Sequence, residues 1–242
     1  MKITRRFITL LAFFFIASLV FVPQRTLAQE NLTRRPDQWT VYTIDPVPWV
    51  WLTEKPDAVR RDGIQFTLPD SADGKYPVFL LANYHGNLTG KMVAATLSLT
   101  AAPETVIIYR PEPNNDGPSP ANVRLYFQTF SGWTSPSPVC SDYWYSNPVS
   151  VTLENLAAGG TTTLTNAFDP ALWSDMNGHF GTNDAAHMAA FAAGLKEVKE
   201  IGLSFGGGWF FSTGVAVSSG SATFGLENYR ISRVVTSPQA EP

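Results

Sequence analysis

Short apolar runs, several with strict apolar–polar alternation, recur along most of this chain between clusters of Gly, Pro, Asn and Asp. The runs are rich in Val, Ile, Thr and aromatic residues, which favour strands, and the intervening clusters are typical of turns. We expect strands over residues 39–44, 49–52, 63–68, 76–82, 92–99, 105–110, 122–129, 143–146, 149–153, 161–165, 200–205, 209–217, 222–226 and 229–235. Many short strands separated by turns predict an all-β sandwich or barrel.

One stretch has helical periodicity instead. Between Asp184 and Lys199, apolar side chains recur at spacings of three and four residues. Asn183 or Asp184 is available as the N-cap, and Lys196 and Lys199 occupy the last turn, where a positive charge is favourable. The pattern predicts one short amphipathic helix before the closing strands, packed on the edge of the sandwich.

The first 28 residues follow a third pattern. Lys2, Arg5 and Arg6 precede an apolar run over residues 7–22, and small residues at Thr26 and Ala28 precede a cleavage point. This is the order of a secretory signal, and the run is shorter than the roughly 20 residues of a bilayer span. We expect a signal peptide over residues 1–28, a secreted product (extracellular, cell surface or periplasmic) and no membrane insertion after cleavage.

Cleavage leaves 214 of the 242 residues, enough for one core to bury roughly 70% of the unfolded chain's surface. We expect a disordered lead-in over residues 29–36, a single β-sandwich domain over residues 37–236 and a flexible tail over residues 237–242. Cys140 is the only cysteine, so no disulfide can form within the chain.

Charge excludes one class of partner. The signal peptide carries four basic and no acidic residues, so its removal takes the formal net charge from −3 to −7. Nucleic acids and anionic membranes attract clustered Lys and Arg. A mildly acidic product is therefore not expected to bind nucleic acid.

Motifs for metals are incomplete. The histidines are His85, His179 and His187. Four residues on either side of His187 lie Asn183 and Phe191, not the second His or acid of a zinc-binding helix. A calcium-loop pattern beginning at Asp175 has Phe180 where an EF-hand requires Gly. We expect surface or capping histidines and no cofactor, with room only for a structural calcium held by Asp and backbone carbonyls.

Catalytic motifs are incomplete as well. Residues 216–220 resemble a nucleophile elbow, but they join two expected strands, whereas an elbow leads into a helix. Gly206, Gly207 and Gly208 precede neither Lys nor a helix, so they favour a bulge or a close backbone approach over phosphate binding. Paired carboxylates for glycoside hydrolysis remain an open alternative, because their spacing is three-dimensional. The sequence leans towards a protein that is not an enzyme.

Polar and aromatic side chains suggest a ligand surface. Alternation over the strand at 122–129 puts Arg124, Tyr126 and Gln128 on one face and Leu125 and Phe127 on the other. That face is either the solvated outside of a sheet or a polar binding groove.

Sugars are bound by flat aromatic rings combined with amide or guanidinium groups. Trp133, Trp144 and Trp173 lie in or beside polar loops. We hypothesise that Trp144 shares the face of Arg124, Tyr126 and Gln128, and that Trp133 or Trp173 rims it.

Two stretches near the C-terminus carry a resemblance. They are residues 201–211 (IGLSFGGGWFF) and 220–231 (GSATFGLENYRI). Over residues 121–232 the chain resembles the galactose-binding-like jelly rolls of exported bacterial proteins, a group with many carbohydrate-binding modules. The resemblance implies a jelly-roll-type antiparallel β-sandwich, a glycan or polysaccharide partner and a structural calcium, although Glu227 stands where the closing motif often has Asp.

The sequence therefore favours a secreted, non-catalytic carbohydrate-binding or cell-surface adhesion module. An exported polysaccharide-acting hydrolase and a structural envelope or matrix protein are the alternatives. A module predicts a groove of aromatic side chains, a hydrolase predicts two facing carboxylates about 5–10 Å apart, and a structural protein predicts a flat apolar patch.

Overall fold

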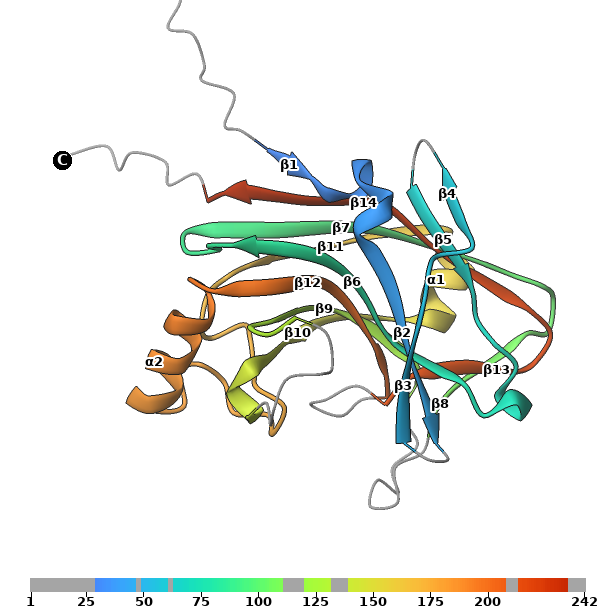
Figure 1. The fold of residues 1–242 in the computed structure, drawn as a ribbon. Coiled ribbons are helices and arrows are strands. Elements are labelled where there is room, and N and C mark those ends of the chain that lie inside the picture. Colours follow the sequence, from blue (N-terminus) through green and yellow to red (C-terminus); the bar gives the residue numbers. More distant parts are fainter. Residues whose placement is uncertain are drawn as a thin grey trace, which may run out of the picture.

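The alternating runs fold into antiparallel strands that build two facing sheets (Figure 1). The structure, a computed structural model, describes residues 29–46, 49–60, 63–110, 120–131, 139–207 and 213–234. In Figure 1, β14, β7 and β11 form one layer above β12, β6, β9 and β10. The expected all-β sandwich is confirmed.

Sheet A has the strand order β11-β7-β14-β5-β4, and β1 pairs with β14. Its strands are β1 Glu30–Asn31, β4 Ala58–Arg60, β5 Gly63–Thr67, β7 Lys91–Ala101, β11 Thr161–Ala167 and β14 Ala222–Arg233.

Sheet B has the order β10-β9-β12-β6-β2-β3, and β8 and β13 form a small separate pair. Its strands are β2 Trp39–Pro46, β3 Trp49–Glu54, β6 Tyr76–Gly86, β9 Asn122–Gln128, β10 Tyr143–Thr152 and β12 Val198–Gly206; the small pair is β8 Val106–Tyr109 and β13 Val215–Ser219. The chain crosses between the sheets from β5 to β6 to β7 and again from β10 to β11 to β12, as expected for a jelly-roll-type sandwich.

The core lies between the sheets. Inward-facing side chains such as Leu97 of β7, Leu125 and Phe127 of β9 and Phe224 of β14 belong to one buried cluster. The approach of β12 to β6 is tight at Gly202, where an added Cβ would lie 2.1 Å from the Leu80 carbonyl oxygen. Any other residue at this position would force the two strands apart.

The outer face of sheet B is buried too, which is unusual because an antiparallel sheet in a sandwich commonly exposes one face. A second cluster lies there, with Tyr42, Phe79, Tyr126 and Tyr145 among its members. Residues outside the central strands, Phe130 and Met176 among them, pack against it. Sheet B therefore has covered side chains on both faces.

The expected helix is present but shorter. Helix α2 spans Ala185–Gly194, with Asp184 as N-cap accepting a hydrogen bond from the His187 backbone N–H. Gly194 packs closely beside Trp144, and from Val198 the chain pairs with β6 as β12. The prediction of helix as far as Lys199 was wrong, because strand pairing takes the last turn.

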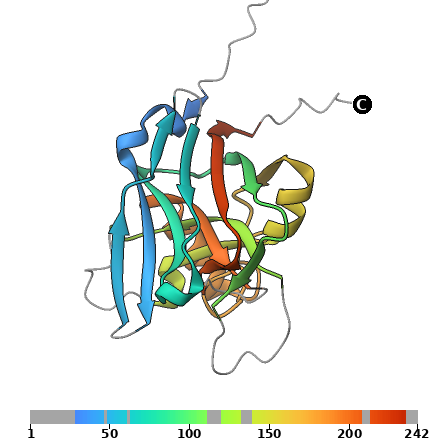
Figure 2. The same ribbon diagram turned by 90° about the vertical axis from the view of Figure 1, so that its right-hand side faces the viewer.

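A second helix, α1 (Leu153–Gly159), was not expected. Thr152 caps it by accepting a hydrogen bond from the Asn155 N–H, and Leu153 and Leu156 are its buried residues. Figure 2 shows α1, in yellow, at the edge of the sandwich. Two pairs of expected strands are continuous instead: residues 143–146 and 149–153 fall largely in β10, and residues 222–226 and 229–235 fall largely in β14.

The N-terminal lead-in is ordered where it was expected to be disordered. Glu30 and Asn31 pair with Ile231 and Arg230 of β14, and Leu32 is buried. The Trp39 indole N–H donates to the Leu32 carbonyl. The burial of Leu32 and the short pairing of β1 with β14 hold this segment in place despite its polar composition.

Both ends of the expected domain plan lie outside the described residues, the signal peptide over 1–28 and the tail over 237–242. Within the described part, neither helix is long and apolar enough to span a bilayer. Cys140 is half-buried in the short 3₁₀ helix Cys140–Asp142.

Candidate functional site

Strand β9 distributes its side chains as the alternation predicts. Leu125 and Phe127 belong to the core between the sheets, and Tyr126 belongs to the outer-face cluster. The Tyr126 hydroxyl donates to Gln128 Oε1 at 2.7 Å, so these two side chains share that face. The predicted grouping of Arg124, Tyr126 and Gln128 therefore describes the outer face of sheet B.

The centre of this face is the carboxylate of Glu200 on β12, which lies opposite Gln128 across the ladder. Tyr42 donates its hydroxyl to Glu200 Oε1 at 2.9 Å, and Gln128 Nε2 donates to Glu200 Oε2 at 2.5 Å. Both carboxylate oxygens thus accept hydrogen bonds in a site from which water is largely excluded. A buried carboxylate is tolerated only when it is paired in this way.

Arg124 extends the polar arrangement towards β10. Its guanidinium lies 5.3 Å from the centre of the Tyr145 ring, and Nη1 donates to Asn147 Oδ1. Asn147 in turn donates to the Ser174 hydroxyl. Burial lowers the pKa of Arg124 to about 10, since desolvation disfavours the charged form.

Ser204 of β12 adds a hydroxyl to the same face. It lies opposite Arg124 on β9 and opposite Phe79 on β6, and it is fully buried. Its Oγ has no hydrogen-bond partner among the described residues. A buried unpaired hydroxyl is rare in folded proteins and calls for a reason.

We call these side chains the polar network: Tyr42, Arg124, Tyr126, Gln128, Asn147, Glu200 and Ser204. Burial, followed by the charge of Glu200, raises the pKa of Tyr42, and burial also raises the pKa of Tyr126. Both phenols are therefore neutral hydrogen-bonding groups at neutral pH. The network combines aromatic rings, an amide, a guanidinium and a carboxylate.

The tryptophans of the sequence hypothesis do not join it. Trp144 and Trp173 are fully buried in the core between the sheets, where both pack against Phe127. Trp144 alternates with Tyr143 and Tyr145, which take the outer face, so it points the opposite way from Arg124. The prediction that Trp144 and Trp173 bind ligand was wrong, and Trp133 lies outside the described residues.

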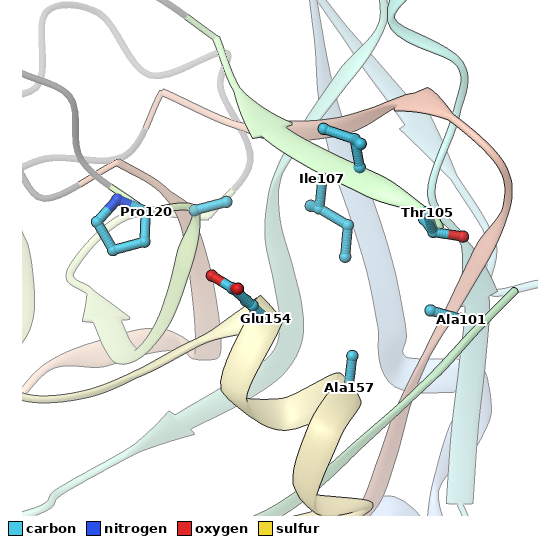
Figure 3. Close-up of a pocket in the computed structure, with 8 residues that line it drawn as sticks. Ala101, Thr105, Ile107, Pro120, Glu154 and Ala157 are labelled. Atoms are coloured by element: carbon cyan, nitrogen blue, oxygen red, sulfur yellow. The ribbon is translucent and has the colours of Figure 1, made fainter. Parts of the chain in front are cut away.

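An open cavity of about 310 Å³ lies elsewhere, where β8 and α1 meet the end of β7 (Figure 3). Its walls are mainly small or aliphatic, such as Ala101, Ile107 and Ala157, and Glu154 contributes a carboxylate. Thr105 Oγ1 already donates to backbone carbonyls. The described residues that line the cavity include no aromatic ring and only the side chains of Thr105 and Glu154 as polar groups, so this part of the wall fits a sugar poorly.

Sequence reasoning missed Glu200, Tyr42 and Ser204. The sequence predicts that Glu200 begins a strand. Because Ile201 is apolar, alternation indicates that the side chain of Glu200 points away from the core. The signal for its role was a single acidic residue in a strand of mainly apolar residues that ends with Phe205. Only the pairing of β12 with β9 reveals its partner Gln128.

Comparisons with known proteins give distant likeness only in structure. No protein-family model matches the chain, and no curated protein sequence matches it. Among solved structures, a xylan-binding module, CBM15, aligns with 87% of this chain and 99% of its own length, at 12% identity and a TM-score of 0.41. A likeness this distant does not indicate a ligand, so function has to be argued from the chain's own residues.

Proposed function

We propose that the protein is an exported, non-catalytic carbohydrate-binding protein, and that the outer face of sheet B is its ligand face. The observation that supports this most is the polar network itself, in which the Ser204 hydroxyl has no hydrogen-bond partner within the described ranges. Burying a carboxylate, a guanidinium and an amide lowers stability unless each is paired. Folding alone does not require such groups here, because the outer face of a sheet can be solvated or covered by apolar side chains. Such groups gather where a polar ligand is recognised.

The chemistry of the network suits a sugar. Amide, guanidinium and hydroxyl groups supply donors and acceptors for ring hydroxyls, and the rings of Tyr126 and Tyr145 supply apolar surface for C–H faces. Phe130 and Met176 pack over this cluster. Ligand entry accordingly requires these two side chains to move aside.

The engagement of the nearby carboxylates favours a binding role over hydrolysis. Glu200 accepts from Tyr42 and Gln128. Asp142 accepts from the Thr129 hydroxyl and the Val139 N–H. A hydrolase needs an acid and a base free to exchange protons with substrate and water, and these contacts oppose that use.

Ser204→Ala tests the proposal. Removing an unpartnered hydroxyl should leave stability nearly unchanged, while the loss of one hydrogen bond to a sugar, about 1 kcal/mol, should weaken binding about fivefold. The measurement is affinity electrophoresis against a panel of neutral and acidic polysaccharides, followed by calorimetry with the oligosaccharide of whichever binds. No release of reducing ends is expected.

Thr163→Ala is the matched control, because Thr163 is exposed on sheet A and bonds only to Thr96 across the ladder. This variant should bind as the unaltered protein does. Failure of every polysaccharide to bind, or equal binding by the Ser204 and Thr163 variants, would reject the proposed ligand face.

A further inference from the structure

Three side chains with metal-binding chemistry converge beside α2. Asp175 and His179 lie in the turn that follows β11, and His187 lies in the first turn of α2. The ligand atoms of these three residues all lie within 4.8 Å of one another. Asp175 Oδ2 is 3.5 Å from His179 Nδ1 and 4.0 Å from His187 Nε2.

The geometry points to a site for a divalent transition metal, best matched by Zn²⁺, held by Asp175 Oδ2, His179 Nδ1 and His187 Nε2. In a tetrahedral zinc site with bonds of 2.0–2.1 Å, ligand atoms stand about 3.4 Å apart. The two separations from Asp175 Oδ2 therefore need contractions of about 0.1 Å and about 0.6 Å, and the two imidazole nitrogens lie within 4.8 Å of each other. Two imidazoles and one carboxylate are ligands that zinc accepts, whereas calcium requires oxygen.

The carboxylate of Asp175 is oriented for this role. The side chain is buried, and its Oδ1 accepts the backbone N–H groups of Asn177 and His179, both at 2.9 Å. These bonds fix the carboxylate and leave Oδ2 directed at the two imidazoles. The centroids of the two imidazole rings lie 4.7 Å apart, so the rings are close enough for one nitrogen of each to share an ion with Oδ2.

His187 is oriented by a second carboxylate. Its Nδ1 lies 2.8 Å from Asp184 Oδ1, an ion-pair contact whose angle is not that of a hydrogen bond, and Asp184 also caps α2. A carboxylate beside one nitrogen of a histidine favours the proton on that nitrogen, which leaves the other nitrogen as the metal ligand. Here the remaining nitrogen is Nε2, the atom that faces Asp175.

The bound ion would hold a segment that covers the polar network. Ser174 exchanges two backbone hydrogen bonds with Tyr145, and Met176 packs on the outer-face cluster. Because Asp175 lies between them, a metal would tie this turn to the start of α2. The side chain of His179 is 47% exposed, so water can complete the coordination.

The test is zinc binding by the purified, EDTA-treated and dialysed protein. Competition with a chromogenic chelator should show one Zn²⁺ per chain, and zinc should raise the melting temperature, because a ligand that binds the folded state stabilises it. Co²⁺ in place of zinc should give the visible absorption of a tetrahedral centre. Millimolar Ca²⁺ should not displace the zinc.

Variants assign the site. His179→Gln and His187→Ala should each weaken zinc binding by more than about 100-fold, and Asp184→Asn by about 10-fold or more, as loss of an orienting carboxylate does. His85→Asn is the control, because His85 is exposed on β6 with a φ of 44° that Asn tolerates. His179 is exposed, so its replacement should leave the circular dichroism spectrum unchanged.

Absence of stoichiometric zinc binding would overturn the proposal. So would equal zinc affinity of the His85, His179 and His187 variants, or binding of Ca²⁺ in preference to Zn²⁺. None of these outcomes depends on whether the polar network binds a sugar.

Discussion

Trp144 stands in a polar stretch of sequence bounded by prolines, yet its side chain is fully enclosed. Its ring stacks on Phe127 at 6.4 Å between centroids and meets the edge of Phe191 at 4.8 Å. The indole N–H donates to the Ser141 carbonyl at 2.8 Å. Its contacts are therefore those of a core residue.

We expect Trp144→Ala to lower the free energy of unfolding by about 3–5 kcal/mol, the range for a large aromatic removed from a packed core. Urea unfolding followed by circular dichroism measures it. Thr163→Ala, an exposed truncation on sheet A, should change stability by less than about 0.5 kcal/mol. A loss below about 1 kcal/mol in the Trp144 variant would show that the ring is not packed as described.

The sequence predicted which residues of β9 share a face but not that this face is covered. Alternation is local, so it places Arg124, Tyr126 and Gln128 together without information from elsewhere. The buried cluster on that face includes Phe130, and Met176, from a turn nearly fifty residues further along the chain, packs against it. For the same reason, the alternation of β10 could not tell whether Trp144 or its neighbours Tyr143 and Tyr145 face the core.

Among the elements, strands with clear alternation were predicted well and short or capped segments poorly. Strand β7 follows its alternating pattern at 92–99 and extends it at both ends. Helix α1 has only seven residues, and its signals were a threonine cap at Thr152 and the glycines at its end. The residues near Val198 have helical periodicity but form a strand, because they pair with β6. A local sequence pattern holds no information about such a tertiary contact.

The buried tyrosines of sheet B should make the free energy of unfolding decrease at alkaline pH. Burial, with the nearby charge of Asp142, raises the pKa of Tyr143 to about 12, and burial raises those of Tyr42 and Tyr126 as well. A tyrosine whose pKa is higher in the folded state stabilises the fold fully below pH 10, and this stabilisation is lost as pH rises through the folded value. Arg124, with a pKa lowered to about 10, acts in the opposite direction.

The destabilising effect of the three tyrosines exceeds the stabilising effect of the one arginine. The urea concentration at the midpoint of unfolding should therefore decrease as the pH is raised from 9 to 11. Tyr143→Phe removes one of the contributing groups and should make the decline shallower. A midpoint that stays constant or rises over this range would contradict the burial of these phenols.

At the scale of the whole molecule, export is a prediction that only experiment can test, because residues 1–28 lie outside the described part of the chain. If residues 1–28 are a cleaved signal, mass spectrometry of the protein recovered outside the cytoplasm should find an N-terminus near Gln29. Pairing of Glu30 and Asn31 with β14 begins directly after that point, so cleavage there leaves both paired residues in the product. Recovery of intact Met1 in a membrane fraction would refute the signal peptide.

Strand β14 is the last strand of the described residues but lies inside sheet A, hydrogen-bonded to β7 on one side and to β5 and β1 on the other. During vectorial synthesis, the ribosome has to deliver nearly the whole chain before this gap can be filled. Until then β5 and β7 each have an unpaired edge, and the core between the sheets lacks Phe224, Leu226 and Tyr229. The order of synthesis thus keeps the nascent chain from completing its fold, which is the state that a translocation channel requires.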